Sequence, residues 1–235
     1  PACGSGTSRT TGRWEARPGQ GPVRTGVTVI LPTSDDFWHS KVPAASFILN
    51  GNGEMTGLHY VKEFGYLETP VIFTNTLALG RALDGGIQYM LRRFPGIGVD
   101  ESTVTPIVGE CDDSALNDMR GLHVTAEDVI TAAEQATDGP VQEGAVGGGT
   151  GMICYDFKCG IGTASRVLPE KAGGFTVGAI VQANFGARGE LRVDGVPVGQ
   201  EIRDKMPVPD EHSEGSLLVV AATDAPLSAR QLERV

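Results

Sequence analysis

The sequence predicts a single α+β domain. Segments typical of strands and segments typical of helices are mixed along the 235 residues, without the regular strand–helix alternation that marks a parallel α/β fold. No internal repeat and no linker-like stretch divides the chain. The composition, with 40% hydrophobic and 20% charged residues, is that of a globular protein with a substantial core.

Strands are predicted from short runs of apolar and β-branched residues. Residues 1–24 are rich in Gly, Arg, Thr and Pro and predict an irregular lead-in. The strand segments that follow are 26–32, 42–49, 70–73, 105–108 and 175–183. A further strand begins at Ser216, and we expect it to be buried on both faces because residues 217–222 are all apolar. Asp194-Gly195 predicts a hairpin turn.

Three helices are predicted from capping residues and apolar periodicity. The first follows a cap within 74–76 and ends at Arg93, with its buried face formed by Leu79, Leu83, Ile87, Met90 and Leu91. The second opens at Thr125, where Asp128 completes a capping-box spacing, and turns Val129, Ile130, Ala133 and Ala136 inward. The third is capped by Ser228.

The net charge and the cysteines argue against several classes of protein. A net charge of −10 argues against binding to nucleic acid or to an anionic membrane surface, and no apolar run reaches the roughly 18 residues of a membrane span. The chain lacks an initiator methionine and an apolar signal core, and we expect it to be truncated at both ends. Cys154 and Cys159 have no second pair to complete a zinc site, so we expect reduced thiols in a cytoplasmic protein.

The sequence contains few of the motifs that are typical of catalytic sites. The glycines of 147–151 invite a phosphate-loop interpretation, but no Gly-Lys-Ser/Thr follows them. The four histidines, at 39, 59, 123 and 212, stand in polar or turn-like settings, and no cluster predicts a metal site. If the Gly215–Ser216 bond were cut, Ser216 would carry a hydroxyl and a free α-amine with a pKa of about 7.7–8.0, which can activate that hydroxyl. The alternative is a serine placed by chance where a loop enters a strand.

Two polar residues could assist such a nucleophile. Asn184 stands at a strand end beside Gly186 and could donate a hydrogen bond to an oxyanion, or it could simply be a turn residue. Glu110 follows the 105–108 strand into a predicted loop and could bind a substrate ammonium, or it could be a solvated loop carboxylate.

Ten short motifs occur in a fixed order over residues 24–235. They are RTGVT (24–28), NGNGE (50–54), TNT (74–76), VGE (108–110), LND (116–118), GAVG with GTG (144–151), GIGTASR (160–166), QANFG (182–186), DGVPVG (194–199), and GS with ATDAP (215–226). Together they resemble the L-aminopeptidase D-amidase/D-esterase family, the self-processing aminopeptidases that include the β-peptidyl aminopeptidases.

The resemblance implies a four-layer α/β/β/α sandwich over residues 25–235, similar to N-terminal-nucleophile hydrolases but with different strand connectivity. It implies self-cleavage between Gly215 and Ser216, giving an α-chain up to 215 and a β-chain from 216. Ser216 would be the nucleophile, with its own α-amine or a neighbouring hydroxyl as the base, and Asn184 would be an oxyanion donor. Glu110 would bind the substrate amine, and Asp112 of the same loop is a second substrate-binding candidate.

The implied reaction releases an N-terminal residue from a peptide, amide or ester through an acyl-enzyme. It needs no cofactor or metal, and its substrates carry a free amino group. The implied assembly is a homotetramer without nucleic-acid or membrane partners. Two departures stand out: Asp112 lies close to the place of a family tyrosine that assists the oxyanion, and the family's chain continues beyond Val235 with a further catalytic serine and an acidic residue. The alternatives are a non-catalytic homologue that binds amines or peptides, and an acyltransferase like the ornithine acetyltransferases, which use threonine at the cut.

Overall fold

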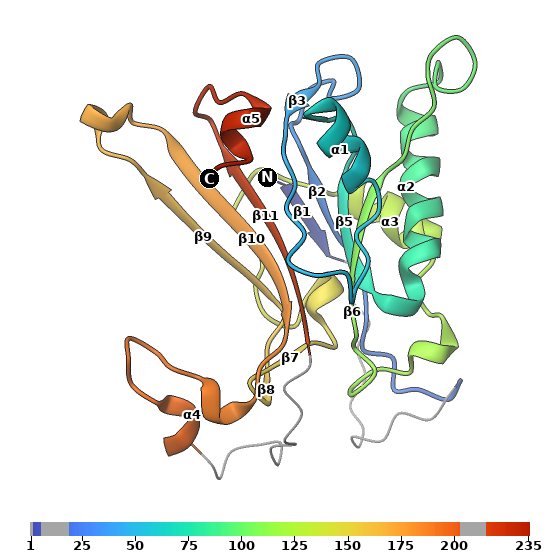
Figure 1. Ribbon diagram of the computed structural model, residues 1–235. Coiled ribbons are helices and arrows are strands. Elements are labelled where there is room, and N and C mark those ends of the chain that lie inside the picture. The colour runs from blue at the N-terminus through green and yellow to red at the C-terminus, as the bar shows by residue number, and fades with distance from the viewer. Residues whose placement is uncertain (1, 6–18, 203–214) are drawn as a thin grey trace.

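A computed structural model of the protein describes residues 2–5, 19–202 and 215–235. Two β-sheets face each other, and helices cover the outer side of one of them (Figure 1). The first sheet has the strand order β1 (Ala2–Ser5), β2 (Thr28–Leu31), β5 (Val71–Asn75), β6 (Ile107–Cys111). The second has the order β11 (Ser216–Thr223), β10 (Thr176–Asn184), β9 (Ile161–Val167). Neighbouring strands are antiparallel except β5 and β6, which are parallel.

The helical layer consists of α2 (Leu79–Arg93) and α3 (Ala126–Glu134), which pack on the first sheet and on each other. A Cβ atom at Gly85 would lie 2.8 Å from the Ala126 carbonyl oxygen, so a glycine is needed where the two helices meet.

The remaining elements are short. They are α1 (Leu58–Phe64), α4 (Val198–Glu201), α5 (Ala229–Leu232), β3 (Val42–Pro43), β4 (Tyr66–Leu67), β7 (Ile153–Cys154), β8 (Phe157–Lys158), and the 3₁₀ turns η1 (Thr76–Ala78), η2 (Met119–Gly121), η3 (Gly147–Gly149), η4 (Glu170–Ala172) and η5 (Arg188–Glu190).

The core is divided between two interfaces because strand side chains alternate between the faces of a sheet. Val108 of β6 packs with the helices, whereas Ile107 and Cys111 of the same strand pack between the two sheets. Ile180 of β10 and Leu218 of β11 meet them there. The start of β11 is therefore held directly against the end of β6.

Several predicted elements are confirmed. Asn75 caps η1, immediately before α2, by accepting the Ala78 N–H at 3.0 Å, and Thr125 with Asp128 forms the capping box of α3. Ser228 caps α5 with Gln231 as its partner. The Asp194-Gly195 turn is present, with both residues at positive φ, although it joins a single bridge and not two strands.

Other predictions are wrong. Within the lead-in, Ala2–Ser5 pairs with β2 as strand β1. Only Val42–Pro43 of the 42–49 segment is a strand, because its partner β4 is two residues long and offers no further ladder. Strand β6 continues to Cys111, so Glu110 belongs to a strand and not to a loop. Leu91 is 44% exposed, because α2 buries Ala82, Tyr89 and Met90 instead.

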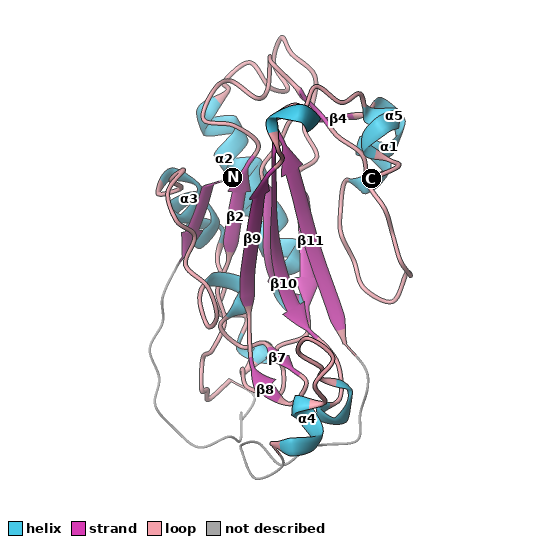
Figure 2. Ribbon diagram, turned by 90° about the vertical axis from the view of Figure 1, so that its left-hand side faces the viewer, coloured by secondary structure: helices cyan, strands magenta, loops and turns pink. Residues whose placement is uncertain are grey.

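The strand at Ser216 is not buried on both faces. Leu218 is buried, but its neighbours Leu217 and Val219 are 51% and 49% exposed. In Figure 2 the sheet β9–β10–β11 faces the viewer, and no helix of the described residues lies across it. Those residues thus form three of the four expected layers. None of their helices is long and apolar enough to cross a membrane.

Candidate active site

Ser216 and Asn184 are brought together by the pairing of β10 with β11. Asn184 is the last residue of β10, Ser216 is the first of β11, and the two are direct partners in the antiparallel register. Side chains at such positions project to the same side of the sheet, with Cβ atoms about 4.5–5.5 Å apart. Because Leu218, two residues further along, is buried against β6, that side is the space between the sheets.

Gly215 is required by the backbone around it. A Cβ atom at this position would lie 2.4 Å from the Phe185 Cα and 2.5 Å from the Asn184 carbonyl oxygen. Any side chain would therefore collide with the main chain that carries Asn184. The glycine before the serine allows the chain to enter β11 in contact with the end of β10.

The amide of Asn184 has a defined orientation. Its Oδ1 accepts the backbone N–H of Ile153 at 3.0 Å, and an N–H can be accepted only by the amide oxygen. The Nδ2 donors consequently point away from Ile153. They meet no acceptor within the part of the chain that the structure describes, so this NH₂ group can donate to a ligand beside Ser216.

The hairpin β7–β8 supports Asn184 and was not predicted. Its two turn residues, Tyr155 and Asp156, both have positive φ, as a type I′ turn requires, although neither is the usual Asn or Gly. Tyr155 packs on Phe185, with ring centroids 5.3 Å apart, and its N–H donates to the Phe185 carbonyl at 2.9 Å. The hairpin is thereby fixed to Phe185, the residue that follows Asn184.

The same hairpin carries a disulfide, which corrects the expectation of reduced thiols. Cys154 and Cys159 are bonded, with Cα atoms 5.5 Å apart. The hairpin turns the chain back on itself between them, so a Cys-x₄-Cys spacing brings the two sulfur atoms together. Cys111 is the free cysteine of the described residues and is buried.

Cys111 lies beside the serine on the inner face of β6. Burial raises the pKa of its thiol to about 11, although the Ser216 hydroxyl and Gln182 act in the opposite direction. Ser216 Oγ itself is shielded from solvent and makes no well-formed hydrogen bond to any described group. The thiol is therefore a neutral neighbour at neutral pH and cannot act as the base for Ser216.

Glu110 lies on the other face of β6. The residue is 7% exposed, and its carboxylate accepts the Glu54 N–H at 3.0 Å and the Thr76 hydroxyl. Strand alternation places it with Val108 on the side of the helices, whereas Cys111 contacts Ser216. The structure thus brings Glu110 to the same end of the strands as Ser216 but does not bring the two side chains onto one face.

Asp112 and Asp113 have opposite environments. Asp112 is exposed, and its Oδ1 accepts the Ser114 N–H at 2.7 Å. Asp113, which the sequence did not single out, is 1% exposed; its Oδ1 accepts from Asn117, while its Oδ2 has no described partner. Burial raises the pKa of the Asp113 carboxyl to about 6, against the opposing effect of hydrogen bonds from Thr25 and Asn117.

The Asp113→Asn variant should lose part of the pH dependence of stability. A carboxyl whose pKa rises from 3.8 to about 6 on folding holds a proton that the unfolded chain has released, so the free energy of unfolding falls as the pH rises from about 4 through 6. This shift corresponds to at most about 3 kcal/mol. We expect Asn, which resembles the protonated acid, to remove that slope in urea unfolding at pH 4.5 and 7.5. Parallel pH profiles of variant and parent would contradict the assignment.

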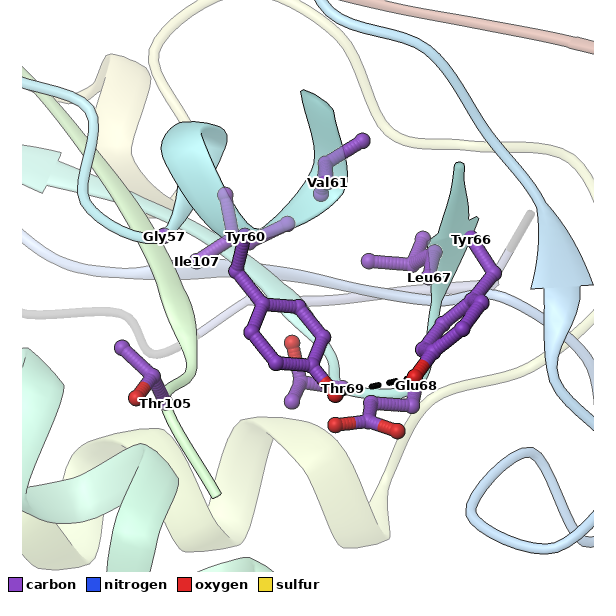
Figure 3. Close-up of a pocket in the computed structure, with 9 residues that line it drawn as sticks. All are labelled: Gly57, Tyr60, Val61, Tyr66, Leu67, Glu68, Thr69, Thr105 and Ile107. Carbon is purple, nitrogen blue, oxygen red and sulfur yellow. Dashed lines mark hydrogen bonds between the residues drawn. The ribbon is translucent and has the colours of Figure 1, made fainter. Parts of the chain in front are cut away.

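A small cavity lies at the opposite end of the strands (Figure 3). It is lined by residues of α1, of β4 with the segment that follows it, and of the start of β6, among them Tyr60, Tyr66 and Glu68. Its volume is about 10 Å³, enough for no more than about one water. Its polar groups already contact one another: the two tyrosine hydroxyls are 3.1 Å apart, and Lys41 pairs with Glu68. This cavity is too small and too well satisfied to be the substrate site.

No metal centre emerges from the described residues, which contain no group of three His, Cys, Asp or Glu side chains placed to hold an ion. His212 lies outside the described residues.

Comparison with known proteins identifies similar chains. Residues 7–235 match the sequence profile of peptidase family S58. The chain is 40% identical over 243 residues to the beta-peptidyl aminopeptidase BapA of Sphingosinicella microcystinivorans, and the match covers 97% of this chain and 60% of that protein. This chain therefore spans about three fifths of the length of that relative.

Solved structures show the same fold. The beta-aminopeptidase of Burkholderia sp. superposes with a TM-score of 0.87 at 44% identity, covering 99% of this chain and 62% of that one. The L-aminopeptidase D-Ala-esterase/amidase of Ochrobactrum anthropi, described as a prototype for the serine aminopeptidases and a new variant of the Ntn hydrolase fold, gives 0.85 at 43% identity, with 99% and 63% covered. The predicted α+β class and the predicted similarity to the Ntn hydrolase fold are confirmed.

Proposed function

Because this chain belongs to peptidase family S58, we propose that it is the nucleophile-bearing part of a self-processing serine aminopeptidase. Hydrolysis of the Gly215–Ser216 bond would place Ser216 at the N-terminus of a second chain. The observation that carries this proposal is the direct pairing of Ser216 with Asn184 at the ends of β11 and β10. The pairing supports the proposal because a serine hydroxyl and a side-chain amide that could act as nucleophile and hydrogen-bond donor lie on neighbouring strands at the same level.

The freed α-amine of Ser216 would be its base. With an unperturbed pKa of about 7.7–8.0, this amine is substantially neutral near pH 8 and can take the hydroxyl proton as Oγ attacks the substrate carbonyl. Ser216 Oγ makes no well-formed hydrogen bond to a described residue, and its neighbour Cys111 is a neutral thiol, so none of these groups competes with the amine for its proton. Attack gives an acyl-enzyme that water then hydrolyses.

Asn184 would stabilise the oxyanion. Its NH₂ group faces away from Ile153 and has no described acceptor, which leaves two N–H donors for the negative oxygen that forms beside Ser216. A donor held in advance needs no reorganisation when that charge develops.

Glu110 would hold the free amino group of the substrate. Each oxygen of its carboxylate accepts one protein hydrogen bond and keeps a second lone pair for an ammonium. The substrates would be small peptides, amides or esters with a free N-terminal amine, as the names of the relatives suggest for those proteins. A homo-oligomer, expected to be a tetramer, would be the working assembly.

Glu110→Gln tests the amine site. We expect the protein to fold, because the amide oxygen can still accept the Glu54 N–H, while the preference for aminoacyl p-nitroanilides over their N-acetylated forms falls about ten- to hundredfold through KM. Asp112→Asn, which removes the exposed carboxylate of the neighbouring residue, is the comparison. An unchanged preference in Glu110→Gln with a loss in Asp112→Asn would transfer the role to Asp112.

A further inference from the structure

Lys158 binds three main-chain carbonyls at the base of the β7–β8 hairpin. Its Nζ donates to the carbonyl oxygens of Gly149 at 3.1 Å and Met152 at 3.0 Å, and to that of Cys159. An ammonium has three N–H donors and no acceptor, so these contacts use all of them. Desolvation by partial burial lowers the pKa of Lys158 to about 8.

One of these carbonyls belongs to the peptide unit that holds Asn184. The Met152 C=O and the Ile153 N–H are the two ends of a single planar amide. Lys158 binds the oxygen at one end, and Asn184 Oδ1 accepts the N–H at the other end at 3.0 Å. A cation on the oxygen fixes the plane of this peptide and polarises it, so the N–H becomes a stronger donor.

The geometry points to Lys158 as a positioning residue for the oxyanion donor. We propose that it acts through the Met152–Ile153 peptide to hold the Asn184 amide with its NH₂ group toward Ser216. This inference rests on the function proposed above for Asn184. We call Lys158 and the Met152–Ile153 peptide that it binds the clamp. Figures 1 and 2 both place β7 and β8 where β10 ends and β11 begins, so the clamp lies within the site and not at a remote surface.

Lys158→Met in the product of the complete gene is the first test. We expect kcat toward an aminoacyl p-nitroanilide to fall about tenfold with KM nearly unchanged. The loss should be moderate because the Cys159 N–H also donates to the Met152 carbonyl, at 3.2 Å. Lys171 is exposed within the 3₁₀ turn η4, so Lys171→Met is the matched control and should keep the parent rate.

A double-mutant cycle separates positioning from general stabilisation. If Lys158 acts through Asn184, Lys158→Met should cost nothing further in an Asn184→Ala background. A second tenfold loss in that background would overturn the inference. Should Lys158→Met fail to fold, Lys158→Gln keeps donors for the carbonyls, and the same comparison applies to it.

Hydrogen exchange at the Ile153 amide tests the clamp without any activity. We expect exchange about tenfold faster in Lys158→Met than in the parent, and unchanged in Lys171→Met. Unchanged exchange in Lys158→Met would refute the clamp and leave the proposed function intact. If the parent protein shows no hydrolase activity, the proposed function fails, while faster exchange would still establish the link between Lys158 and this amide.

Discussion

Replacing Ser216 with alanine should abolish both self-cleavage and hydrolysis. One hydroxyl would serve both reactions, so we expect a single uncut chain and a fall in kcat/KM of at least about 10⁴-fold, the order seen when a catalytic nucleophile is removed. Alanine leaves the backbone of β11 and its pairing with Asn184 unchanged. Intact mass and p-nitroanilide turnover, measured on the same preparation, check both parts of this prediction.

Ser165→Ala is the matched control for that experiment. Ser165 lies in the neighbouring strand β9 and is exposed, so its loss should change neither cleavage nor turnover. Amidase activity retained by an uncut Ser216→Ala protein would eliminate Ser216 as the nucleophile.

Replacing Asn184 with aspartate should lower kcat about 10²–10³-fold while leaving the fold in place. A carboxylate can still accept the Ile153 N–H, so the support from the hairpin remains. It supplies no N–H donor, however, and its charge opposes the oxyanion, whereas a single oxyanion donor contributes a factor of this size in comparable sites. Steady-state kinetics of a processed sample, with thermal unfolding as a check on folding, make the measurement.

Gln135→Glu adds the same charge at an exposed position at the end of α3 and serves as the control. We expect it to match the parent in both rate and stability. Parent-like turnover in Asn184→Asp would show that the oxyanion is held by other groups, and the role assigned to Asn184 would have to be withdrawn.

Periodicity and capping predicted the helical layer well because those signals are local. Asn75, Thr125 and Asp128 act through hydrogen bonds to residues within three positions, so the sequence alone contains the whole interaction. The exposed Leu91 shows the limit of this approach. Which stripe of α2 is buried is decided by the close approach of α3 at Gly85, and that contact joins distant segments.

Strands were harder to predict because pairing partners decide where they end. Residues 44–49 have the composition of a strand, yet β4 offers only Tyr66 and Leu67 as partners. Strand β9 is mostly exposed small and polar residues, so no apolar run marked it. The run after Ser216 is apolar throughout, but only one of its faces meets another layer of the described residues.

The candidate residues Ser216 and Asn184 could be proposed from the sequence, whereas the hairpin that supports Asn184 could not. Gly215 and Ser216 adjoin, and Asn184 ends a recognisable strand. Ile153 reaches Asn184 only because an unusual turn at Tyr155 and Asp156 folds the hairpin back. A pair of cysteines five positions apart is the one local sign of that hairpin, and the prediction of reduced thiols is wrong there because the two cysteines are bonded.

The proposed function depends on cleavage of this chain before Ser216 by its own chemistry. The most direct test is the intact-mass spectrum of the protein purified after expression of its complete gene, followed by N-terminal sequencing of each component. We expect two chains in equal amounts, the second beginning with Ser-Leu-Leu-Val. A single uncut mass that persists on prolonged incubation at pH 8 would contradict the proposal and would favour a homologue that binds amines or peptides without cleaving them.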